Sequence, residues 1–98
     1  MNDNQLNWDN LLAFVAARNE LHLETRRGHP FTARKERDTI FFTPSSTEIA
    51  RPETRRTGER FLTEFYRTGN STTSHYQQIS ANSSYMLTLI SHVTDHSR

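Results

Sequence analysis

The chain has 98 residues, of which 33% are hydrophobic, and its formal net charge at pH 7 is +1. Cysteine is absent, which excludes disulfide frameworks, Cys-ligated zinc, iron–sulfur clusters and thiol nucleophiles and fits a cytoplasmic protein. The length predicts one domain over residues 1–98. No apolar run reaches the roughly 20 residues that span a bilayer, and the polar N-terminus lacks a basic leader, so neither a membrane partner nor secretion is expected.

The first predicted element is a helix over residues 7–19. Its apolar residues recur at helical spacing and form one stripe, made of Trp8, Leu11, Leu12 and Val15. Asn7 is a suitable N-cap, because its side chain can accept a hydrogen bond from a free N–H group of the first turn.

Residues 21–43 show the alternation of a half-buried sheet. Strands are predicted at 21–26, 31–35 and 39–43, and the turns "RGHP" and "KERD" join them into an antiparallel meander. One face carries Leu21, Leu23, Phe31, Ala33, Ile40 and Phe42 toward the helices. The other face carries His22, Glu24, Arg26, Thr32, Arg34 and Phe41. A slip of one residue in the register would exchange the two faces of a strand.

Two further helices are predicted after the strands, at residues 52–68 and 83–94. Pro52 suits the first position of the earlier helix, Glu53 complements its dipole, and Gly69 suits its C-terminal stop. The order of elements predicts an α+β fold, in which the N-terminal helix and the two C-terminal helices pack on one face of a three-stranded sheet.

Basic residues are concentrated between positions 26 and 60, where nine basic side chains face five acids. Nearly all are arginines, which suit bidentate contacts with phosphate, although the base composition of the gene is an alternative explanation of that bias. Arginines beside an exposed aromatic ring are what a platform for single-stranded nucleic acid needs. The residues predicted to contact phosphates are Arg26, Arg27, Arg34 and Arg37 around the strands, and Arg56 and Arg60 in the second helix.

The arginines of "ARPETRRTGERF" do not share one face of the predicted helix. At about 100° per residue, Arg51 and Arg55 lean toward the inward face, while Arg56, Arg60 and Arg67 project outward in one row. Glutamates at positions 53, 59 and 64 flank the outward row and reduce its positive field. Three interpretations of this row stay open: a solvated helix face with local ion pairs, a phosphate-binding row and a contact with a protein partner.

Three apolar side chains are candidates for a protein interface. Phe41 lies on the predicted outer face of the sheet, where it marks either a dimer contact or a second layer of core. Tyr85 lies at the border of the apolar stripe of the last helix, and Leu87 projects away from that stripe. The modest apolar content also favours a partner, so a homodimer is an alternative expectation.

The patterns for catalysis and metal binding are weaker. His92 and His96 share one side of the last helix, but Val93 stands where the helical zinc-protease signature has Glu. The three glycines, at positions 28, 58 and 69, are too far apart for a P-loop or a dinucleotide fingerprint, and a Gly-x-Ser-x-Gly elbow is missing. No catalytic residue, metal ligand or cofactor is therefore assigned.

The sequence favours a small cytoplasmic binding module over an enzyme. The expected partner is DNA or RNA, held through its backbone phosphates with little readout of the bases. A protein-interaction or homodimerisation module is the alternative, and a small hydrolase or metal protein is the third interpretation.

Overall fold

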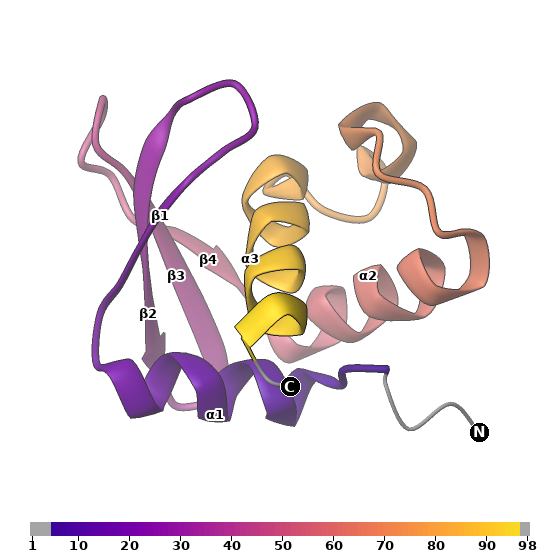
Figure 1. Ribbon diagram of the computed structural model, residues 1–98, viewed down its shortest axis with the longest axis horizontal. Helices are drawn as coiled ribbons and strands as arrows, with labels where there is room; N and C mark the ends of the chain where they lie inside the picture. The colour runs from indigo at the N-terminus through magenta and orange to yellow at the C-terminus, as the bar shows by residue number, and fades with distance from the viewer. Residues whose placement is uncertain (1–4, 97–98) are drawn as a thin grey trace.

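The computed structural model describes residues 5–96 as a four-stranded antiparallel sheet with its helices on one face (Figure 1). In chain order the elements are α1 (Trp8–Arg18), β1 (Leu21–Glu24), β2 (Pro30–Glu36), β3 (Thr39–Pro44), β4 (Arg51–Glu53), α2 (Arg55–Thr68), the 3₁₀ helix η1 (Thr73–Tyr76) and α3 (Ser83–His96). The sheet order is β1-β2-β3-β4. The α+β class is confirmed, with one strand more than predicted. No helix within residues 5–96 is long and apolar enough to cross a bilayer.

The first helix begins where the sequence indicated, because its N-terminus is capped from both sides. The Asn7 side chain accepts a hydrogen bond from the Asn10 N–H, and the Asn10 side chain accepts one from the Asn7 N–H. This reciprocal pair is a capping box built from two asparagines. The predicted apolar stripe of α1 is buried in the core.

The predicted faces of the first three strands are confirmed by the register. Leu21 lies opposite Ala33, and Ala33 lies opposite Phe42, so one buried row crosses the sheet. His22 and Arg34 point to the exposed outer face.

The first strand is shorter than predicted. Thr25 donates its N–H to the His29 carbonyl at 3.0 Å, and Gly28 donates to the Thr25 carbonyl at 2.8 Å, so residues 25–29 form a tight turn with Gly28 at φ 83°. Arg26 therefore belongs to this turn and not to the outer face of the sheet.

The fourth strand corrects the prediction that a helix begins at Pro52. Residues 51–53 pair with β3 instead, and Pro52 lies opposite Phe41. The Ser45 N–H donates to the Pro30 carbonyl, and every second residue of β3 before Ser45, including Phe41, therefore bonds to β2. Phe41 and Pro52 thus form a non-bonded pair, and the Pro52 nitrogen points to the open edge of the sheet. Proline is tolerated there because the ladder loses no donor. Helix α2 begins three residues later than predicted, after Thr54.

Helix α2 ends at the predicted glycine and contacts α1 at another. Gly69 is left-handed, at φ 69° and ψ 12°, and its N–H donates to the Phe65 carbonyl. Gly58 lies directly under the Trp8 indole, where a Cβ would overlap the ring. The indole N–H donates to the Asp38 carbonyl at 2.7 Å, which joins α1 to the β2–β3 turn.

The polar connection between α2 and α3 is anchored in the core by Tyr76. Its ring stacks on Phe61 with 4.2 Å between centroids, and its hydroxyl donates to the Asn70 carbonyl. Helix α3 then runs to His96, two residues beyond the prediction. Met86, Leu89 and Val93 bury its inward face.

A buried carboxylate joins β4 to both C-terminal helices. Glu53 is 1% exposed, and its Oε1 accepts hydrogen bonds from the Ser80 hydroxyl at 2.6 Å and the Asn82 amide at 3.0 Å. Its Oε2 accepts from the Thr57 hydroxyl at 2.6 Å. The prediction that Glu53 lies in the second helix and complements its dipole was therefore wrong, because residue 53 belongs to β4 and its side chain is buried.

Substituting Gly58 by alanine tests the contact between α1 and α2. Alanine is favoured over glycine in a helix by about 1 kcal/mol, but the Trp8 ring occupies the space that its Cβ needs. We expect Gly58→Ala to lower the free energy of unfolding by about 1–3 kcal/mol, measured by urea denaturation. Thr63→Ala on the exposed side of α2 is the control and should not destabilise. Equal stability of Gly58→Ala and the parent would show that this contact is loose.

The network around Glu53 is tested by comparing two substitutions. Glu53→Ala leaves the buried Ser80 hydroxyl and an N–H of the Asn82 amide without their acceptor, whereas the Thr57 hydroxyl also has the Thr54 carbonyl. Each buried donor without an acceptor costs ~1–3 kcal/mol. Glu53→Gln keeps one acceptor oxygen, and the Thr57 hydroxyl can turn to accept from the new amide. Denaturation should therefore show a much larger loss for Glu53→Ala than for Glu53→Gln. Similar losses would contradict the hydrogen-bonded account.

Candidate functional site

The acidic side chains near α2 are engaged within the fold, and this decides which arginines stay free. Arg55 contacts Asp9 at 2.7 Å and both Asp38 and Glu59 at 3.4 Å. The hydrogen bond from Arg55 lowers the pKa of Asp9. The hydrogen bond to Asp9, and to a smaller extent the one to Asp38, raises the pKa of Arg55. This cluster joins α1, the β2–β3 turn and the first turn of α2, as expected for an arginine that leans inward.

The second acidic site lies at the other end of α2. Glu64 accepts hydrogen bonds from Arg67 at 2.8 and 2.9 Å and contacts His75 at 2.7 Å. Arg67 and then His75 lower the pKa of Glu64 from its ordinary 4.5 to about 2. Glu64 therefore joins α2 to η1. Glu53, Glu59 and Glu64 each bond to residues other than Arg56 and Arg60.

The six arginines predicted to bind phosphate share one property. Within residues 5–96, none of them forms an ion pair with a carboxylate, and all six are exposed. They are Arg26, Arg27, Arg34, Arg37, Arg56 and Arg60. Arg67, the third arginine of the outward row, pairs with Glu64, whereas Arg56 and Arg60 form no ion pair within residues 5–96 because the other glutamates bond elsewhere.

The structure separates the arginines of the sheet. Arg26 and Arg27 lie in the β1–β2 turn, and Arg37 lies in the β2–β3 turn at the opposite end of β2. A seven-residue strand spans roughly 20 Å, so these two ends do not form one patch. Arg34 lies on the outer face opposite Phe41, which is half-buried.

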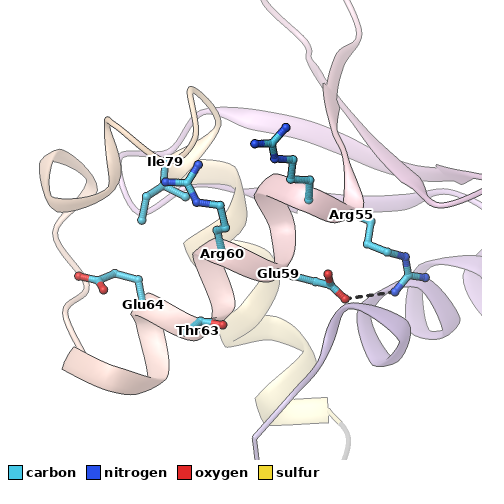
Figure 2. Close-up of a pocket in the computed structure, with 7 residues that line it drawn as sticks. Arg55, Glu59, Arg60, Thr63, Glu64 and Ile79 are labelled. Carbon is cyan, nitrogen blue, oxygen red and sulfur yellow. Dashed lines mark hydrogen bonds and ion pairs between the residues drawn. The ribbon is translucent and has the colours of Figure 1, made fainter.

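The two outward arginines of α2 line a shallow hollow of about 760 Å³. Figure 2 shows Arg60 beside Ile79, while the Glu59 side chain points away from Arg60 and contacts Arg55. Thr63 and Arg56 complete the arginine side of the hollow. Arg55 and the carboxylates of Glu59 and Glu64 line the same hollow, so a phosphate here would meet acidic as well as basic groups. The sequence could not indicate Ile79, because it comes from a distant loop.

A larger groove of about 1370 Å³ lies between β1, the β1–β2 turn and α3. Its lining includes Arg26, Arg27 and His29 from the turn, and Ser83 and Ser84 from the start of α3. Figure 1 shows the start of α3 between the β1–β2 turn and the loop that carries η1. Many of the hydroxyl groups along the groove belong to the polar connection between α2 and α3, for which the sequence indicated no binding role.

The three predicted interface residues do not share one surface. Tyr85 packs against Phe31 and Phe42, with centroid distances of 4.7 and 5.7 Å, and so borders the core. Leu87 is half-buried in the wall of the groove on the inward side of the sheet. Phe41 lies on the outer side, so the sheet separates it from both.

The histidines of α3 form a stacked pair. The rings of His92 and His96 lie 4.0 Å apart, and His96 Nδ1 contacts the His92 carbonyl at 2.8 Å. Burial lowers the pKa of His92, and His96 and Arg18 lower it further. Among residues 5–96, no three His, Asp or Glu side chains are grouped to hold a metal ion.

Comparisons with protein-family models, with curated proteins and with solved structures each found no match. The candidate surfaces therefore rest on the geometry and chemistry of this chain alone.

The pKa of Glu64 predicts how its ion pairs contribute across pH. A carboxylate with a lowered pKa stabilises the fold above its unfolded value near 4.5, and this contribution disappears as pH falls toward 2. Urea midpoints of the parent and Glu64→Gln should differ at pH 6 and converge near pH 2. Glu36→Gln, whose exposed carboxylate has no ion pair in residues 5–96, is the control. A difference for Glu64→Gln that stays constant with pH would contradict the assignment.

Proposed function

We propose that this protein is a non-catalytic module that binds the phosphate backbone of DNA or RNA through its free arginines. The observation that supports it is the distribution of ion pairs. The arginines named from the sequence are exposed and form no ion pair within residues 5–96, while Arg55 and Arg67 bind the nearby acids. Such arginines make bidentate contacts with phosphate and release counterions on binding.

Two patches contain four of the six arginines that are predicted to contact phosphate. The turn patch consists of Arg26 and Arg27, and the helix patch consists of Arg56 and Arg60, one helical turn apart. Arg34 and Arg37 lie outside both patches. Because the free arginines occupy several elements, a polymer with repeated phosphates suits them better than a single small anion. Backbone contacts of this kind position a nucleic acid and carry little information about its sequence.

The other functional interpretations have less support. A hydrolase or metal protein would need a grouped set of catalytic or ligating side chains, and none was found for metal in residues 5–96. A homodimerisation module is compatible with nucleic-acid binding, since the two use different residues.

Salt-dependent binding tests the helix patch. Labelled single-stranded and duplex oligonucleotides would be titrated with the parent and with Arg56→Gln/Arg60→Gln, followed by fluorescence anisotropy at several salt concentrations. We expect the double variant to bind more weakly and its log–log salt slope to fall in magnitude by about 1.4–1.8, because each phosphate contact contributes about 0.7–0.9. Arg26→Gln/Arg27→Gln tests the turn patch in the same way.

The control removes the same charge elsewhere. Lys35→Gln/Arg51→Gln takes two exposed basic residues from outside the six predicted positions, so its salt slope should change little. Equal losses in the control and in both patch variants would show a diffuse effect of net charge. Parent affinity weaker than about 10⁻⁴ M at low salt would refute nucleic-acid binding.

A further inference from the structure

The two edges of the sheet differ in their free backbone groups. Thr25 donates to the His29 carbonyl across the β1–β2 pair, and antiparallel strands alternate between bonded and non-bonded pairs. Leu23 and Leu21 therefore direct their backbone groups to β2, whereas His22 and Glu24 direct theirs to the open edge. No strand of residues 5–96 pairs with that edge.

The opposite edge is closed to a further strand. β4 has three residues, and Pro52 presents a nitrogen without a hydrogen to solvent at its centre. Proline and short length are devices that protect edge strands from pairing. In β1 no proline interrupts the free edge, so any strand that extends this sheet must add there.

We propose that two copies of this chain pair through β1, antiparallel about a two-fold axis at Leu23. In this register, His22 lies opposite Glu24 of the second copy, and Glu24 lies opposite its His22. The free N–H and C=O groups of these residues then bond to one another, and Leu23 faces its own copy in a non-bonded pair. The product is one continuous sheet of two subunits.

Charge selects this register over its neighbours. The outward side chains of β1 are His22 and Glu24, and pairing about Leu23 sets each His22 opposite Glu24 of the second copy. An axis at His22 would oppose Glu24 to Glu20, and an axis at Glu24 would oppose Glu24 to itself, and like charges directly opposite are destabilising. Charged residues usually protect an edge strand, but this order makes the edge complementary to itself.

The inward side of β1 offers an apolar contact as well. Leu23 is half-buried, and it lines the groove together with Leu87 and Thr88 of α3. The Leu23 side chain of the second copy would enter the groove from the same face and cover this surface. Symmetric association of this kind is isologous, with each subunit contributing the same patch. The dimer does not rest on nucleic-acid binding and would present two copies of each arginine patch.

A cysteine scan of β1 reads the register directly, because the chain has no cysteine of its own. Residues in a non-bonded antiparallel pair have Cα atoms about 4.5 Å apart, within the disulfide range of about 4.4–6.8 Å. Under mild oxidation, Leu23→Cys should form a covalent dimer several-fold faster than His22→Cys or Glu24→Cys, whose symmetry mates are offset along the strand. Faster cross-linking at position 22 or 24 would overturn the register.

Sedimentation over a wide range of protein concentration tests the association itself, without nucleic acid present. The parent should shift from monomer toward dimer as its concentration rises. His22→Glu places two glutamates opposite each other and should shift the protein to monomer, and His22→Glu/Glu24→Lys should restore the dimer. Circular dichroism would check that each variant is folded. A parent that stays monomeric throughout, with no preference for cross-linking at position 23, would refute the proposal.

Discussion

The buried carboxylate of Glu53 is the constraint on which the arrangement of the C-terminal half depends. It sits at the end of β4, and its oxygens accept hydrogen bonds from Thr57 in α2 and from Ser80 and Asn82 just before α3. A charged group in the interior is tolerated only when it is well hydrogen-bonded. Three segments must therefore keep a fixed geometry around this side chain, and the start of α3 and one end of the groove are placed by it.

Ion pairs between side chains of neighbouring elements also determine the distribution of charge on the surface. Arg55 and Arg67 take up Glu59 and Glu64, so these carboxylates do not neutralise Arg56 and Arg60. The net charge of the chain is only +1, yet free positive charge remains where the acids are engaged elsewhere. Local pairing, more than the overall balance of charge, decides which arginines have no carboxylate partner within residues 5–96.

The sheet connects the two proposals. Helices cover its inward face. Its β4 edge presents Pro52, which has no N–H group, and its β1 edge keeps free backbone groups at His22 and Glu24. Pairing through that edge would join two subunits without using the arginines of α2. A dimer would then hold several phosphate-binding patches at fixed spacing, and multivalent binding of that kind strengthens attachment to a polymer.

Local patterns in the sequence determined α1, the faces of the first three strands and the stop at Gly69, because each depends on residues a few positions apart. The sequence also divided Arg55 from Arg56 and Arg60 through helical periodicity alone. Only the tertiary structure decided the pairing of Arg51–Glu53 with β3, the burial of Glu53 and the choice of acid for each arginine. These outcomes require contacts between residues far apart in the chain, and local propensity contains no information about which distant partner a side chain meets.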